Sequence, residues 1–313
     1  MCGCSPISQV SHLPKPADFV RVGVQKSEGR LVPLELHPES IFGMGLTYAD
    51  HIKETGSHFD PRKAPPVFRK KMVSFNPCAR PVRVPSRRDL INCADSVEPG
   101  LGKRLEKDFK QLPPLLDYEG ELGFVLLEDV DWNKVRDPGY APAIGYFIAN
   151  DLSARIVAVL GEGMTNRYDY WEASKSFEGF LPVGSTMWIP EVHAANAIFS
   201  TVIMTKVNGE VRQEDWTTNM IYTPRQMLVF IADTYPDDLP RKGDIVLTGT
   251  PSGVGMRVPA WKAWLSDVLR LDRFTKLGFL IRSAGKQNRF LKPGDVVVVS
   301  GGILGEVKTE IVE

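Results

Sequence analysis

Apolar residues along the chain fall mainly into short runs that predict β-strands. Glu121–Leu127 contains only apolar residues and glycine after its first position, as expected for a strand buried on both faces. Phe199–Val207 leads into Asn208-Gly209, a pair that readily adopts the positive φ angles of a type I′ turn. We therefore expect a β-hairpin that returns through Glu210–Arg212.

The N-terminal part of the chain has a hairpin pattern of its own. Phe19–Val24 is strand-like, residues 27–30 have the composition of a turn, and Leu31–Leu36 forms the returning strand. Pro33 has no backbone N–H, so the second strand is expected at a sheet edge. These patterns predict a tail and a small cap hairpin over residues 1–40 and a main catalytic domain over residues 41–313.

Helical patterns are fewer and cover residues 48–55, 224–233 and 260–271. The last of these belongs to residues 258–290, which we interpret as an insertion whose helix packs on the core or on a second subunit, with an active-site lid as the alternative. Residues 80–114 also resemble an insertion, because they are Pro-rich and charged without clear periodicity. This mixture predicts a β-rich α+β fold rather than alternating βαβ units.

The charge balance narrows the classes of partner. The 313 residues include 38 basic and 38 acidic side chains, so no general attraction to nucleic acid or to an anionic membrane is expected. The apolar runs are shorter than the roughly 18 residues of a membrane span. The N-terminus lacks the pattern of a signal peptide, and the four cysteines are too few and scattered for a disulfide framework. We expect a cytoplasmic protein that acts on a small molecule, with no nucleic-acid or membrane partner.

Two glutamates mark the first candidate for chemistry. Glu119 and Glu121 stand two residues apart at the start of a predicted strand, so their side chains point to one face. Two carboxylates beside an apolar run repel one another, and a bound Mg²⁺ or Mn²⁺ would relieve that repulsion because these cations prefer oxygen ligands. A solvated strand face is the alternative for this pair alone.

Asp151 is the candidate for a third metal ligand. It follows the aromatic and apolar segment Gly145–Asn150, where a strand is expected to end. An aspartate in this place also caps a following helix, which is the alternative interpretation. Arg155 lies four residues further on and is expected to pair with a substrate carboxylate.

His51 and Glu54 lie three residues apart in the predicted helix over residues 48–55, so they are neighbours on its surface. Glu54 would accept the imidazole N–H and raise the basicity of the other nitrogen, which is the arrangement of a general base. An exposed pair without a catalytic role is the alternative, although Gly43 and Gly45 nearby favour a close approach of the backbone to a site.

Lys175 and a Gly-rich loop complete the candidates. Lys175 lies between an acidic and an apolar segment and would bind a substrate carboxylate or an enolate, unless it is a surface residue. Residues 248–255, Thr-Gly-Thr-Pro-Ser-Gly-Val-Gly, follow a predicted strand and allow backbone N–H groups to approach an anion. The loop lacks the spacing of a Walker phosphate loop, and the chain has neither a GxGxxG fingerprint nor a G-x-S-x-G elbow.

Taken together, these segments resemble the fumarylacetoacetate hydrolase family. The shared motifs, in the family's order, are G-x-x-Y-A-D-H-x-x-E at 45–54, Y-E-G-E-L-G at 118–123, N-D-L-S-A-R at 150–155, K-S-F at 175–177 and G-D-I-V-L-T-G-T-P-S-G-V-G at 243–255. The resemblance covers residue 41 to the end apart from the two insertions. Each motif alone is weak evidence, whereas the set in this order is specific.

The resemblance implies a fold, an assembly and a metal site. Family members form a β-rich roll of mixed sheets and are usually homodimers, so we expect a homodimer here. Their metal, Mg²⁺ or Mn²⁺ (with Ca²⁺ as an alternative), is held by the two acids of E-x-E and the aspartate of N-D. In this chain those residues correspond to Glu119, Glu121 and Asp151.

The resemblance also assigns catalytic and substrate-binding roles. A His–Glu pair on a lid-like helix activates water, and it corresponds to His51 and Glu54. The lysine of K-S-F, here Lys175, lines the substrate site and is expected to be catalytic. Substrate contacts are expected from five residues in or beside the matching motifs: Tyr48, Lys70, Arg155, Gly249 and Thr250.

The chain departs from the family's pattern around the substrate. Ile156 and Ala158 stand where the family often has an aspartate and a glutamine after S-A-R. Thr47 replaces the usual asparagine of G-x-N-Y, and Lys71 replaces the proline of F-x-K-P. The metal ligands are retained while the substrate contacts differ, so we expect an unusual substrate, larger or less polar than an acylpyruvate.

The favoured function is hydrolysis of a carbon–carbon bond in a β-diketo or acylpyruvate-type acid. In the family's chemistry the cation polarises the carbonyls and stabilises the enolate, and here His51 would deprotonate the attacking water. A decarboxylase of oxaloacetate-like acids, or a keto–enol tautomerase or isomerase, is the first alternative, which Ala158 slightly favours. A non-catalytic binding protein is the second.

Overall fold

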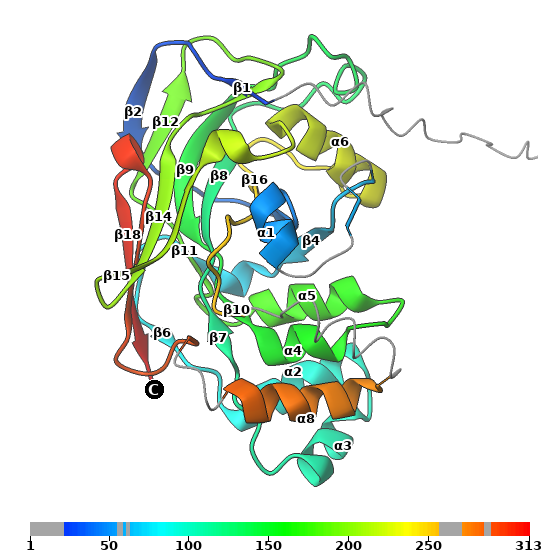
Figure 1. The fold of residues 1–313 in the computed structure, drawn as a ribbon. Helices are drawn as coiled ribbons and strands as arrows, with labels where there is room; N and C mark the ends of the chain where they lie inside the picture. The colour runs from blue at the N-terminus through cyan, green and yellow to red at the C-terminus, as the bar shows by residue number, and fades with distance from the viewer. Residues whose placement is uncertain (1–21, 55–58, 61–62, 257–270, 285–288) are drawn as a thin grey trace, which may run out of the picture.

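A computed structural model describes residues 22–54, 59–60, 63–256, 271–284 and 289–313 of the chain. Figure 1 shows a curved arrangement of strands on one side and a stack of helices on the other. The predicted β-rich α+β class with mixed sheets is confirmed. No helix in these residues is long and apolar enough to cross a membrane.

The main sheet carries the acidic segments at its centre. β8 and β9 are wholly buried and pair antiparallel, which explains why both sequences are nearly continuous apolar runs. The described pairs of this sheet are antiparallel apart from β16 and β3, which run parallel. In the described part of the chain it has seven strands, in the spatial order β2 (Gly29–Pro33), β12 (Thr186–Pro190), β9 (Ile144–Asn150), β8 (Gly120–Leu126), β16 (Ile245–Leu247), β3 (Ile41–Met44) and β4 (Val67–Lys70).

A second sheet lies against the main one. Its strand β14 contacts β8, and its strands β17 and β18 contact β9, so the two sheets enclose a common apolar core. Within the described ranges it has five strands, in the order β15 (Glu210–Trp216), β14 (Val202–Val207), β17 (Val296–Ser300), β18 (Glu306–Val312) and β6 (Val82–Arg83). The described residues also form short strand pairs outside these two sheets: β1 (Gly23–Val24) with β13 (Ala197–Ile198), β7 (Leu116–Asp117) with β10 (Ser153–Ala154), and β5 (Phe75–Asn76) with β11 (Leu181–Pro182).

Helices form a layer beside the end of the main sheet (Figure 1). α5 packs on β4, α4 and α2 pack on α5, α8 packs on α4, and α3 packs on α2. α6 also contacts β4. The helices among the described residues are α1 (Ala49–Glu54), α2 (Arg87–Val97), α3 (Leu101–Asp108), α4 (Arg155–Leu160), α5 (Arg167–Lys175), α6 (Pro224–Thr234) and α8 (Arg273–Ala284), with 3₁₀ turns η2 (Met72–Ser74), η3 (Thr217–Asn219) and η4 (Gly302–Leu304).

Several local predictions are confirmed. The hairpin of β14 and β15 turns at Asn208 and Gly209, whose φ angles are 50° and 85°. α6 begins with a capping box between Thr223 and Gln226, and Pro224 occupies its first turn, where a missing N–H costs nothing. α1 lies within the predicted helix over residues 48–55.

The predicted N-terminal hairpin is wrong in its pairing. β1 pairs in parallel with β13, whereas β2 pairs antiparallel with β12 over five residues and forms an edge of the main sheet. Local sequence suggested two strands facing each other, but β12 offers β2 a longer partner. Pro33 does lie on an edge strand, as predicted. The division into a cap and a catalytic domain stays a prediction.

That residues 80–114 and 258–290 are insertions stays a prediction. Residues 80–114, whose sequence has no clear periodicity, contain β6, α2 and α3. Ser86 and Asp89 form a reciprocal capping box that starts α2. The helix predicted over residues 260–271 lies outside the described residues, apart from residue 271, and α8 follows it.

The turn at Gly209 gives a first testable prediction. Gly209→Ala should destabilise the protein by about 1–2 kcal/mol, because an L-residue is strained at this left-handed conformation. The added Cβ has nothing within 4 Å to clash with, so backbone strain alone accounts for the loss. Urea unfolding measures it, with the exposed Gly139→Ala, whose φ is not positive, as the control. Equal losses in both variants would contradict the strain argument.

Candidate active site

Three carboxylates converge where β8 begins and β9 ends. The register of the two strands places Gly120 opposite Asn150, and Asp151 N donates to Glu119 O at 2.8 Å. This pairing brings Asp151 beside Glu119 and Glu121. One ligand atom from each of the three side chains lies within 4.8 Å of the others, and all three residues are buried. The geometry therefore brings together the three predicted metal ligands.

Two buried lysines reach this acid cluster from different elements. Lys175, at the end of α5, places Nζ 2.7 Å from Glu119 Oε2 and 2.6 Å from Asp151 Oδ2. Lys70, at the end of β4, pairs with the other oxygen of Asp151 and also donates to Phe180 O at 3.3 Å. Lys175 is thus an internal residue, and the surface alternative is wrong.

Arg155 binds carboxylates of the protein itself. Its Nε donates to Asp117 Oδ2 at 2.8 Å, and its Nη2 donates to Glu119. The buried Asp117 also accepts backbone N–H groups of Gly255 at 2.7 Å and Met256 at 3.0 Å. Arg155 therefore ties the acid cluster to the Gly-rich loop, and its expected contact with a substrate carboxylate stays a prediction.

The cluster shifts the pKa values of its members in opposite directions. Burial alone would raise the pKa of Glu119, but the charges of Arg155 and Lys175 outweigh it and lower the pKa to about 2. Burial, together with the charges of Asp151 and Glu119, raises the pKa of Glu121 well above its ordinary value. Burial lowers the pKa of Lys70, because it disfavours the charged ammonium group. Burial would also lower the pKa of Lys175, but the charges of Asp151 and Glu119 outweigh it and raise that pKa.

These residues fit a hard divalent cation. Glu121 forms no ion pair within the described part of the chain, and one of its oxygens accepts only the Gly249 N–H, at 2.9 Å. Its ionised form is therefore destabilised beside two other carboxylates, as the raised pKa shows. A cation with several oxygen ligands would offset that repulsion, and Mg²⁺ or Mn²⁺ has this preference.

The Gly-rich loop is held against the cluster by backbone conformation and by hydroxyl groups. Gly249 has a φ of 90°, which turns its N–H toward Glu121. Thr250 Oγ1 donates to Gly120 O at 3.0 Å. Thr47 Oγ1 donates to Thr248 O at 2.6 Å, so the threonine that replaces the family's usual asparagine anchors this loop.

Gln213 was not predicted as a site residue, yet it touches both sides of the site. Its Oε1 accepts the Gly120 N–H at 3.0 Å, and its Nε2 donates to Thr250 Oγ1 at 2.8 Å. The sequence signal is slight: a single amide within the charged segment after the Asn208-Gly209 turn.

The His51–Glu54 pair is partly assembled. His51 is buried, and its Nδ1 lies 3.6 Å from Glu54 Oε2, beyond a hydrogen bond. Glu54 Oε2 is fixed by the Gly253 N–H at 2.8 Å, so α1 is attached to the Gly-rich loop. A positive charge on His51 is the last of the influences that lower the pKa of Glu119, after the charges of Arg155 and Lys175.

Tyr48, a predicted substrate contact, has a buried hydroxyl without a hydrogen-bond partner among the described residues. Burial, with the charges of Asp215 and Glu121, raises the pKa of this phenol well above its ordinary value. Tyr48 therefore stays neutral and can donate a hydrogen bond beside the cluster.

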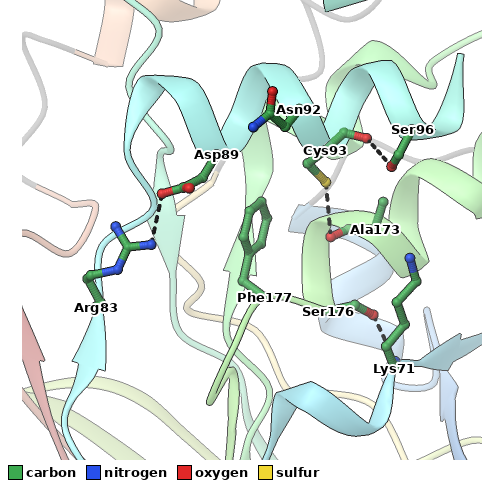
Figure 2. A pocket seen from close by; sticks show the side chains of 9 residues that line it. All are labelled: Lys71, Arg83, Asp89, Asn92, Cys93, Ser96, Ala173, Ser176 and Phe177. Atoms are coloured by element: carbon green, nitrogen blue, oxygen red, sulfur yellow. Dashed lines mark hydrogen bonds and ion pairs between the residues drawn. The ribbon is translucent and has the colours of Figure 1, made fainter. Parts of the chain in front are cut away.

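A separate cavity of about 350 Å³ lies between α2 and α5 (Figure 2). Figure 2 shows Lys71 and Ser176 on one wall and Cys93 on the opposite helix. On this wall the Lys71 backbone N–H donates to Ser176 Oγ at 3.0 Å. Lys71 and Ser176 directly follow the site residues Lys70 and Lys175 in the sequence. None of the predicted site residues lines this cavity.

The fold brings three buried carboxylates to one place, where they could hold a divalent cation. The chain belongs to the fumarylacetoacetate hydrolase family. The sequence model of the fumarylacetoacetate (FAA) hydrolase C-terminal domain matches residues 40–312, which include every predicted site residue. Members of this family are enzymes, and the family expectation is confirmed.

Similar proteins carry names within this family. The mitochondrial oxaloacetate tautomerase FAHD1 of Mus musculus is 30% identical over 222 residues, covering 69% of this chain and 81% of that protein. The oxaloacetate tautomerase YisK of Bacillus subtilis is 28% identical, covering 71% of this chain and 62% of that one. Fumarylpyruvate hydrolase of Pseudomonas aeruginosa, solved with Mn²⁺ and pyruvate, has the same fold with a TM-score of 0.55 at 20% identity, covering 96% of this chain and 99% of that one.

Glu121 gives the test of the metal site. Glu121→Gln should weaken Mn²⁺ binding by about tenfold or more, because ligands and their supporting residues contribute at least that much. In the wild type, affinity should also fall as the pH falls, since protons compete for Glu121, and its raised pKa makes this competition begin at a higher pH than for an ordinary glutamate. Isothermal titration calorimetry at several pH values measures both effects.

The control for this test is Glu128→Gln, which removes an exposed carboxylate just beyond the end of β8. It should bind Mn²⁺ as the wild type does. Equal affinity in the Glu121 and Glu128 variants would remove Glu121 from the ligand set.

Proposed function

We propose that this enzyme requires Mg²⁺ or Mn²⁺ and hydrolyses a carbon–carbon bond in a small β-diketo or acylpyruvate-type acid. The observation that carries this proposal is the buried acid cluster together with the His51–Glu54 pair, because Glu121 and Glu54 both accept backbone N–H groups of the Gly-rich loop. Glu119, Glu121 and Asp151 would hold the cation. When bound, the cation would polarise the carbonyl oxygens of a 2-keto acid.

His51 would act as the general base. Its Nε2 would take a proton from the attacking water, while Glu54, fixed by the Gly253 N–H, would accept a hydrogen bond from Nδ1–H. The 3.6 Å separation between Nδ1 and Glu54 Oε2 is expected to shorten when the imidazole becomes positively charged, because charge strengthens the hydrogen bond.

The lysines would supply positive charge for the substrate. Lys175 Nζ lies between Glu119 and Asp151 and would neutralise a substrate carboxylate or the charge that develops on its oxygens. Tyr48, whose buried hydroxyl has no hydrogen-bond partner among the described residues, adds a neutral donor. The burial of these groups keeps bulk water away, which strengthens each electrostatic contact.

A keto–enol tautomerase is the second candidate. Two curated relatives, from mouse and Bacillus subtilis, are named oxaloacetate tautomerases. Ile156 is wholly buried in the core and Ala158 has no polar group, so neither can orient a water molecule as the family's usual polar residues would. In a tautomerase, His51 would carry a proton between carbon and oxygen, and no water would attack.

A turnover screen separates the candidates. Acylpyruvates, fumarylpyruvate and oxaloacetate are incubated with Mg²⁺, Mn²⁺ or EDTA, and products are identified by mass spectrometry. A metal-dependent pair of acid products supports hydrolysis. Release of CO₂ from oxaloacetate indicates decarboxylation, and a metal-dependent loss of enol absorbance without mass change indicates tautomerisation. No turnover despite Mn²⁺ binding would contradict both proposals.

The homodimer expected for the family is also a proposal, tested by light scattering after gel filtration.

His51 gives the mechanistic prediction. His51→Asn should retain Mn²⁺ affinity within about twofold but lose hydrolysis by roughly 10²–10⁴-fold, the usual contribution of a general base. Calorimetry and steady-state kinetics measure the two quantities. The exposed His37→Asn is the control and should change neither. If hydrolysis persisted in His51→Asn, another group would be the base.

A further inference from the structure

A β-bulge aims one amide of the second sheet at the active site. Thr205 pairs with Gln213, whereas Lys206 pairs with Val211, so Arg212 is an extra residue without a partner on β14. Bulges of this kind redirect the next side chain and are frequent beside active sites. In β15 the only buried residue is Gln213, which is 1% exposed.

Each polar atom of Gln213 is used by the site. Its Oε1 accepts the N–H of Gly120, the residue between Glu119 and Glu121, at 3.0 Å. Its Nε2 donates to Thr250 Oγ1 at 2.8 Å and to Pro251 O at 3.0 Å. A single buried carboxamide thus bridges the segment of the two glutamates and the Gly-rich loop.

The backbone around Gln213 is packed too closely for another arrangement. A Cβ on Gly120 would lie 2.2 Å from Thr205 Oγ1, so the Gly120 peptide rests directly on β14. A Cβ on Gly253, where φ is 108°, would lie 2.1 Å from the carbonyl oxygen of Arg212. The bulge is therefore in contact with the loop that fixes Glu54.

Gln213 also determines which way the Thr250 hydroxyl points. A hydroxyl has one hydrogen to donate and two lone pairs. The Thr250 hydrogen is directed to Gly120 O at 3.0 Å, and one lone pair accepts from Gln213. Toward a substrate, the hydroxyl is left with one lone pair, which matches a donor such as an enol hydroxyl.

We propose that Gln213 is a positioning residue with two actions. It fixes the Gly120 peptide and so holds Glu119 and Glu121 at the separation that suits a divalent cation. It also sets the Thr250 hydroxyl as an acceptor for a hydroxyl of the substrate, and this second action rests on the proposed function above.

The test combines Gln213→Met, Thr250→Val and the double variant. Gln213→Met keeps the length of the side chain and removes its hydrogen bonds, so Mn²⁺ binding should weaken by about tenfold to a hundredfold. Gln213→Met should also raise KM for a keto acid in the wild-type background but not when Thr250 is already Val. Its effect on Mn²⁺ affinity should persist in that background, because it acts through Gly120.

The control is Thr309→Val in β18, which alters a buried residue of the second sheet away from Gly120. The Thr309 hydroxyl has no hydrogen-bond partner among the described residues, so Mn²⁺ affinity and KM should not change. Gln213→Asn has a side chain one methylene shorter and should weaken Mn²⁺ binding as much as Gln213→Met does. It serves as the test variant if Gln213→Met does not fold. Mn²⁺ affinity within twofold of wild type in a folded Gln213 variant would overturn the first action.

The measurements distinguish a failure of the proposed function from a failure of the positioning role of Gln213. Mn²⁺ affinity and hydrogen exchange at the Gly120 amide require no substrate, so they judge the first action even if the enzyme turns over no keto acid. Absence of turnover would overturn the proposed function and, with it, the second action. Additive effects of the Gln213 and Thr250 changes on KM would overturn the second action alone.

Discussion

Mutual repulsion of buried carboxylates is the constraint on which this structure depends. Glu119, Glu121 and Asp151 meet at the ends of the central strands β8 and β9, where burial makes each negative charge costly. The compensating cations come from the edge strand of the sheet and from the helical layer: Lys70 ends β4 and Lys175 ends α5. The helical layer is thus joined to the sheets by charge as well as by apolar packing, and the site forms only when both layers are in place.

Features encoded by neighbouring residues could be predicted from the sequence. The turn at Asn208-Gly209 needs only its own φ preferences, and Glu119 and Glu121 share a face because a strand alternates. Features that depend on a distant partner could not be predicted. β2 pairs with β12, which follows it by about 150 residues, instead of its neighbour β1. α2 is a different case, because the capping box of Ser86 and Asp89 that starts it is local but was not recognised as a helix start.

Gln213 shows most clearly why the site was only partly predictable. Strict alternation along β15 gives no reason to choose this amide, since its direction depends on a bulge that appears only when the register with β14 is known. The departures from the family pattern behave similarly. Thr47 turned out to anchor the Gly-rich loop, and Ile156 belongs to the apolar core, so each replacement is understood only from its packing.

The same bulge has a consequence for solubility. β15 is the outer strand of the second sheet among the described residues, and such an edge exposes unpaired N–H and C=O groups to other chains. An extra residue at Arg212 interrupts the regular ladder that a foreign strand would need, and charges at Glu210 and Glu214 add repulsion. A distortion that serves the active site therefore also protects the folded protein against edge-to-edge aggregation.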